Sequence, residues 1–236
     1  MMLIGERRAL GSIVFVFFGL LYLLNGLVGP PPLAPMFVGM AAIYLVAFFG
    51  IVACWFWARW YAMGVALSGV AMGVLLAYQI GLEAFVIFYL ASHGLAALMM
   101  FGHGPVSAYE GRRDWRERWK LDDNAVNRLG RSVTRAGASM PYLVLVTLAP
   151  RDQGLALAAL GLGLAGLVGL VRLRTWALAA LASSAAVVGV TAGFEVSFSP
   201  LDAMTIGLLV LAILPFAGPA LRALRSDTLS SPEVPS

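Results

Sequence analysis

The sequence predicts an all-α protein that crosses a membrane many times, and three observations support this prediction. Hydrophobic residues make up 61% of the 236 residues and charged residues only 12%, about half the charged share of a soluble domain. The apolar residues fall into eight long runs separated mostly by short connections rich in turn formers. Basic residues gather beside the ends of these runs, as in polytopic membrane proteins, and form no patch on a soluble fold. We therefore expect a helical bundle in the lipid bilayer and no nucleic-acid partner.

The eight apolar runs are predicted to be transmembrane helices, because each crossing needs about 20 apolar residues. The first run is longer than the core of a signal peptide and lacks a cleavage site, so we expect it to be retained. The runs cover residues 9–28, 34–57, 60–81, 83–102, 136–149, 154–171, 175–194 and 202–221. The predicted organisation is a four-helix half (1–102), a cytoplasmic loop (103–135), a second four-helix half (136–225) and a disordered tail (226–236).

The fifth run is the shortest, and the positive-inside rule tests it. With eight spans and a cytoplasmic start, 15 of the 16 basic residues lie inside, whereas removing the fifth span leaves 12 of 16 inside. We therefore predict eight spans with both termini in the cytoplasm, in a bacterial or archaeal cytoplasmic membrane. We also expect Asp122 to cap a helix that runs through Val126, Leu129 and Val133 into the fifth span.

A weak internal repeat relates the two halves. An offset of 115 aligns residues 33–71 with 148–186 and gives ten identities over 39 positions, where composition alone would give roughly four. After a slip of four residues, 82–84 align with 201–203. These matches indicate two four-helix halves in the same orientation, a parallel repeat. Similar membrane composition in the two halves is the alternative explanation.

Three carboxylates are expected near the outer face of the membrane. Glu83 and Asp202 begin the fourth and eighth helices at matching places in the repeat, and Glu195 ends the seventh. Carboxylates at a membrane boundary are candidates for a cation or proton site. A carboxylate at a helix N-terminus is also stabilised by the exposed N–H groups, which explains Glu83 and Asp202 without a ligand.

His93 lies in the middle of the fourth predicted helix, one turn after Tyr89. A histidine at this depth must be satisfied by neighbouring helices or by a bound molecule. A haem clamp by both histidines is excluded, because His103 lies roughly 15 Å further along the same helix. A structural hydrogen bond is therefore the first interpretation, and contact with a quinone, a proton or a pigment is the alternative.

Small residues at helical spacing predict close packing between helices. The third helix carries Gly69 and Gly73, and the sixth carries Gly161, Ala165 and Gly169. The long cytoplasmic loop has a different character, because its basic and aromatic residues suit a short helix on the inner leaflet or a surface that docks a partner. The residues concerned are Arg112, Arg113, Trp115, Arg116 and Trp119.

Catalytic signatures are not found in the sequence, so the leading hypothesis is a non-enzymatic membrane subunit or accessory protein. It would pack against other membrane proteins or a second copy, or would hold an apolar ligand such as a lipid, quinone or pigment. A small transporter or channel using the outer carboxylates, and a redox or quinone module centred on His93, are the two alternatives. A retinal protein is excluded because Lys120, the one lysine, lies in the loop.

Overall fold

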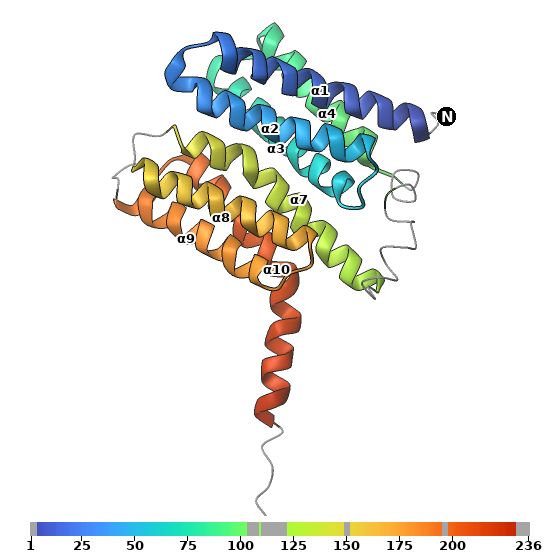
Figure 1. The fold of residues 1–236 in the computed structure, drawn as a ribbon, viewed down its shortest axis with the longest axis vertical. Helices are drawn as coiled ribbons and strands as arrows, with labels where there is room; N and C mark the ends of the chain where they lie inside the picture. The colour runs from blue at the N-terminus through green and yellow to red at the C-terminus, as the bar shows by residue number, and fades with distance from the viewer. Residues whose placement is uncertain (1–3, 103–108, 110–121, 149–151, 195–197, 230–236) are drawn as a thin grey trace, which may run out of the picture.

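The computed structural model describes residues 4–102, 109, 122–148, 152–194 and 198–229, and in these ranges the chain is helical and contains no strand. The helices form an upper group and a lower group that run roughly side by side across the molecule (Figure 1). The upper group is α1 (Ile4–Val28), η1 (Pro31–Leu33), α2 (Ala34–Val52), α3 (Ala58–Ile80) and α4 (Ala84–Met100). The lower group is α7 (Asp123–Val146), α8 (Gln153–Val171), α9 (Trp176–Phe194) and α10 (Pro200–Leu229).

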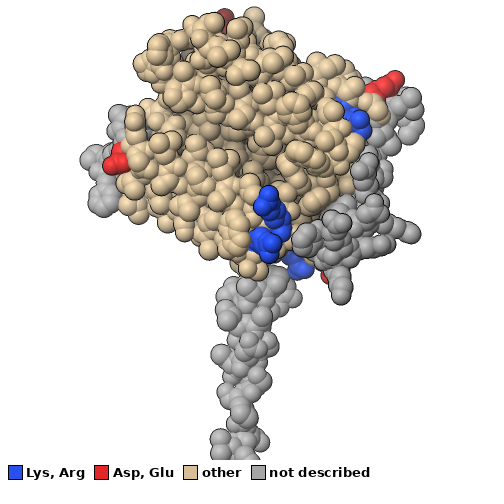
Figure 2. Space-filling view, in the orientation of Figure 1, with Lys and Arg blue, Asp and Glu red and all other residues tan. Residues whose placement is uncertain are grey.

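Six of the described helices are long and apolar enough to cross a membrane by length and composition, as expected for a multi-pass membrane protein. These segments are Gly5–Val28, Pro31–Val52, Ala58–Ile80, Gln153–Val171, Trp176–Gly193 and Pro200–Ala217. The two remaining predicted spans differ, because α4 has only 17 residues and α7 carries several charged residues. Uncharged side chains cover most of the face in Figure 2, and basic ones lie near the turn between α8 and α9.

Each group of four helices has the same pattern of neighbours. In the upper group α1 packs on α2 and α4, and α3 packs on α2 and α4. In the lower group α7 packs on α8 and α10, and α9 packs on α8 and α10. The two groups meet mainly where α3 packs on α7, with a smaller contact between α2 and α7. Helix α7 therefore belongs to its own bundle and also forms the junction with the other.

Helix α7 begins where the capping argument predicts. The side chain of Asp122 accepts a hydrogen bond from the Ala125 N–H at 2.6 Å, and the helix continues without a break to Val146. This confirms the predicted helix from Asp122 through Val133 into the fifth apolar run. This helix continues across residue 135, where the predicted loop gives way to the second half. Helix α10 extends to Leu229, past the start of the predicted tail at residue 226, and residues 230–236 lie outside the described ranges.

The backbones of α3 and α7 touch directly at glycines. A Cβ atom added to Gly64 would collide with the carbonyl oxygen of Thr134 and would lie 2.8 Å from the amide nitrogen of Ala138. From the other side, a Cβ on Gly137 would lie 3.0 Å from the Tyr61 ring and 3.2 Å from its carbonyl oxygen. At these two positions there is room for the hydrogen of glycine but not for a Cβ atom, so glycine is what allows the two helices to approach this closely.

Side-chain hydrogen bonds tie α7 to both of its main neighbours. Ser132 donates to the Ala212 carbonyl at 2.6 Å and Arg135 to the Leu211 carbonyl at 2.6 Å, both on α10. Tyr142 donates to the Ser68 carbonyl of α3 at 2.9 Å. Fifteen of the 24 residues of α7 are buried. A helix surrounded by protein in this way needs less apolar surface than one that faces lipid.

The small residues of α8 pack on a different face from the predicted one. Gly161 is exposed and a Cβ there would meet nothing within 4 Å. The close contacts fall at other glycines of the helix, Gly163 against Leu143, Gly166 against Leu181 and Gly169 against Ala177. Of the two glycines in the predicted stripe, Gly169 lies in such a contact and Gly161 does not, because α8 turns its buried face toward α7 and α9.

We predict that Gly64→Ala lowers the free energy of unfolding by about 1–3 kcal/mol, because the added methyl group forces α3 away from α7. The measurement is thermal unfolding of the detergent-solubilised protein. The matched control is Gly161→Ala, which adds the same methyl group to open space and should be neutral or slightly stabilising through helix propensity. Equal melting temperatures for the two variants would contradict the close contact.

Candidate functional site

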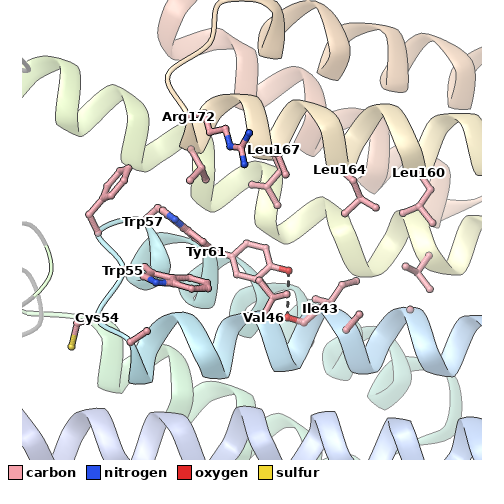
Figure 3. Close-up of a pocket in the computed structure, with 17 residues that line it drawn as sticks. Ile43, Val46, Cys54, Trp55, Trp57, Tyr61, Leu160, Leu164, Leu167 and Arg172 are labelled. Atoms are coloured by element: carbon pink, nitrogen blue, oxygen red, sulfur yellow. Dashed lines mark hydrogen bonds between the residues drawn. The ribbon is translucent and has the colours of Figure 1, made fainter. Parts of the chain in front are cut away.

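A groove of about 780 Å³ lies between the two bundles. Its walls are α2, from Gly39 to Val46, and α8, from Leu160 to Val171 (Figure 3). Its volume falls in the range of ligand sites in proteins, about 300–1,000 Å³. Most of its lining side chains are aliphatic or aromatic. The groove therefore suits an apolar molecule.

The floor of the groove is made by α3 and α7. Tyr61 lies across it and donates a hydrogen bond to the Ile43 carbonyl at 3.3 Å, so its hydroxyl is turned toward the α2 backbone (Figure 3). At one end, a Cβ on Gly39 would lie 3.2 Å from Val144 of α7. This close approach of α2 to α7 closes the groove at that end.

The opposite end of the groove is aromatic and basic. Trp55 and Trp57 come directly after α2, with ring centroids 5.2 Å apart, and Trp57 meets the Tyr61 ring edge to face at 5.8 Å. Arg172 comes directly after α8 and its guanidinium points into the space between the bundles (Figure 3). Within the described part of the chain, neither indole N–H nor this guanidinium has a hydrogen-bond acceptor.

Two similar turns hold these side chains in place. After α2, the Trp55 N–H donates to the Gly50 carbonyl at 3.0 Å, and Cys54 has a left-handed φ of 53°. After α8, the Arg174 N–H donates to the Gly169 carbonyl at 2.8 Å, and Leu173 has a φ of 55°. Both are helix-terminating turns of the kind that usually has glycine at the left-handed position. Each turn reverses the chain at the end of a groove wall and fixes the position of the next few residues.

Arg8 adds a second cation near this end. Its guanidinium donates to the Sγ of Cys54, a groove residue, at 2.8 Å. Tyr109 lies beside the same pair and donates to the Ile51 carbonyl at 3.1 Å, and burial raises the pKa of its hydroxyl to about 12. The aromatic end is thus positively charged, with no carboxylate among the groove-lining residues.

A smaller cavity of about 180 Å³ lies between helices α1 to α4 of the upper bundle and the C-terminal part of α7. Methionines and tyrosines line much of it, including Met40, Tyr22, Tyr44, Tyr89 and Tyr142. His93 lies next to these tyrosines and is fully buried. Its ring is 4.1 Å from the Tyr89 ring, measured between centroids.

Both ring nitrogens of His93 have protein partners. Nδ1 lies 2.8 Å from the Tyr89 carbonyl oxygen and must donate to it, because that oxygen is only an acceptor. Nε2 therefore accepts from the Tyr44 hydroxyl at 2.7 Å. Gly69 leaves the space for the ring, since any Cβ there would overlap it, and Gly73 faces Leu90 and Tyr89 in the same way. This arrangement gives His93 a structural role.

Two of the three carboxylates of the predicted outer site, Asp202 and Glu83, lie in the described residues, and each begins a helix. Asp202 is buried, and one of its carboxylate oxygens accepts hydrogen bonds from the Ser199 N–H at 3.0 Å and hydroxyl at 2.7 Å. The Asp202 N–H donates back to the Ser199 hydroxyl at 3.3 Å, which completes a capping box at the start of α10. Glu83 is the exposed N-cap of α4, and Glu195 lies outside the described residues.

Several other predicted positions also fall outside the described ranges. They are the loop residues Arg112, Arg113, Trp115, Arg116 and Trp119. Among the residues that are described, no three of His, Cys, Asp and Glu are grouped so that they could hold a metal ion.

Sequence reasoning did not predict the groove. The position of Trp55 and Trp57 opposite Arg172 depends on how two helices far apart in the chain are placed. The sequence does hold one sign that α2 and α8 are equivalent helices. A tryptophan follows shortly after the last turn of each, Trp57 after α2 and Trp176 after α8.

We predict that Tyr44→Phe destabilises the protein by about 1–3 kcal/mol, because the buried Nε2 of His93 loses its donor. Thermal unfolding in detergent measures the effect. Tyr61→Phe is the control, because it removes a hydroxyl from a carbonyl that already accepts a bond within α2. A Tyr44→Phe melting temperature equal to that of the wild type would show that the hydrogen bond does not hold His93.

Comparison of this chain with family models, with curated proteins and with solved structures gives no match.

Proposed function

We propose that this chain is a non-enzymatic membrane protein that holds the apolar chain of a membrane molecule in the groove between its two bundles. The observation that carries the proposal is the groove itself, about 780 Å³ with aliphatic walls on α2 and α8. A cavity of this kind buries an alkyl chain and excludes water, and each buried methylene contributes about 0.8 kcal/mol. The role is that of a binding or accessory subunit, with other membrane proteins or a second copy as its partners.

The proposed topology has eight crossings with both termini in the cytoplasm. In addition to the six apolar helices, it uses α4 and the buried part of α7. The basic residues of α7 support it, since Arg128 and Arg131 lie in the first half of the helix and Arg135 directly follows its midpoint. With the N-terminus of α7 in the cytoplasm, the ends of α2 and α8 lie on the cytoplasmic side too. The aromatic end of the groove then lies at the inner interface, where tryptophan and arginine are stabilised.

We further propose that the two bundles are a parallel repeat. Helices α1 and α7 begin 119 residues apart, as do α2 and α8, which have 19 residues each. The left-handed residues Cys54 and Leu173 have the same separation. The equivalent helices in each bundle also have equivalent neighbours. These pairs favour an offset of 119 over the 115 that the sequence identities suggested.

The two alternative functions have less support. An ion-coupled transporter would need buried outer carboxylates that are free to bind a cation, but Asp202 is engaged in a helix cap and Glu83 is exposed at the start of α4. A redox module centred on His93 would need a free ring nitrogen, and both nitrogens are in protein hydrogen bonds. The groove has no such competing explanation.

We predict that a membrane amphiphile copurifies with the wild-type protein and is lost when the groove is filled. Val46→Trp and Leu164→Trp each place a large ring in the groove from opposite walls. The readout is native mass spectrometry of protein released from mild detergent, with mass spectrometry of the extracted small molecules. We expect at least a tenfold loss of bound amphiphile in both variants.

Leu157→Trp is the matched control, because Leu157 is an exposed residue of α8 that does not line the groove. It should bind as the wild type does. Wild-type protein that carries no amphiphile, or filled variants that retain it in full, would rule out the proposed function.

A further inference from the structure

The two ends of the groove differ in chemistry, and this difference restricts what can occupy it. The end at Gly39 and Val144 is closed and apolar. The other end presents Arg172 and the indole N–H groups of Trp55 and Trp57, all of them hydrogen-bond donors without an acceptor in the described part of the chain. An occupant must therefore carry an apolar portion and, at one end only, hydrogen-bond acceptors.

The length of the groove matches one leaflet of a bilayer. From Gly39 to the end of α2 at Val52 that wall rises about 20 Å, and from Leu160 to the end of α8 at Val171 the other rises about 17 Å, at about 1.5 Å per residue. Half of a hydrocarbon core is about 15 Å, and the interfacial region adds the rest. An acyl chain that reaches the closed end thus puts its headgroup beside the tryptophans.

Charge at this end of the groove favours a negative headgroup. Arg172 and Arg8 are both near it, and the residues that line the groove include no Asp or Glu to pair with a positive headgroup. Helix dipoles do not reverse this preference. The C-termini of α2 and α8 lie here together with the N-termini of α3 and α9, so their partial charges oppose each other.

We propose that the occupant is an acidic phospholipid of the cytoplasmic leaflet, with its acyl chain between α2 and α8 and its phosphate at Arg172. The guanidinium donates two hydrogen bonds to the phosphate oxygens, as arginine does at phosphate sites. The tryptophan N–H groups donate to the remaining oxygens or to the ester carbonyls of the lipid. This inference rests on the proposed function, since it names the chemical class of the molecule held in the same groove.

The test compares two lipids that share acyl chains and differ in net charge. Dioleoyl phosphatidylglycerol and dioleoyl phosphatidylcholine are titrated separately into delipidated, full-length protein in mild detergent, and binding is read by native mass spectrometry. We expect the wild type to bind phosphatidylglycerol at least tenfold more tightly. Arg172→Gln should reduce this preference to less than threefold, and Arg172→Lys should keep part of it.

Arg174→Gln is the matched control, because it removes the same charge two residues later at a side chain that does not line the groove. It should leave the preference within twofold of the wild-type value. Glycerol phosphate at millimolar concentration is the second control and should not displace the lipid, because it lacks the acyl chain that the groove buries.

The outcomes separate this inference from the proposed function. Equal binding of the two lipids, or equal effects of Arg172→Gln and Arg174→Gln, would overturn the acidic-lipid assignment while leaving a groove that binds amphiphiles. Displacement by glycerol phosphate would also overturn it, because a soluble anion would then suffice. If neither lipid binds, or if Val46→Trp leaves binding of both unchanged, the proposed function fails as well.

Discussion

Backbone contact between α3 and α7 is the interaction on which the rest of the structure depends. Gly64 packs directly on the α7 backbone, and Gly137 packs on the ring and carbonyl oxygen of Tyr61. A bilayer supplies little hydrophobic force to join two bundles, so close packing must do so. The hydrogen bonds of Ser132 and Arg135 then fix α10 to the other side of α7. One helix thus organises its own bundle and also sets the position of the other.

The groove results from this main junction together with the smaller contact between α2 and α7. With contact concentrated at α3 and α7, the outer helices α2 and α8 stand on either side of it, and their apolar faces line a shared space. They converge with α7 at Gly39 and Gly163 and leave room toward their C-terminal ends. The turns at Cys54 and Leu173 then direct aromatic and basic residues to that end. Shape and polarity of the site therefore come from the same arrangement.

Local patterns in the sequence predicted where helices form. They could not predict which helices pack together when these are far apart in the chain. The cap at Asp122 could be predicted because its partner, Ala125, is only three residues away. Ser199 and Asp202, which form the cap of α10, are also three residues apart. The packing face of α8 could not be predicted from the sequence, because its glycines, at 161, 163, 166 and 169, lie on more than one face of the helix. The groove depends on α2 and α8, which are more than 100 residues apart, and no short-range pattern encodes their relative position.

The glycine junction also limits how the molecule can move. A contact made of backbone atoms cannot be loosened by side chains that change rotamer, so α3 and α7 stay in register while they stay in contact. Any change in the width of the space between α2 and α8 then has to be a rocking of one rigid bundle on the other, with the crossing point at Gly64 as the fulcrum. Small rotations there are amplified at the far ends of the two wall helices, beside the bilayer surface.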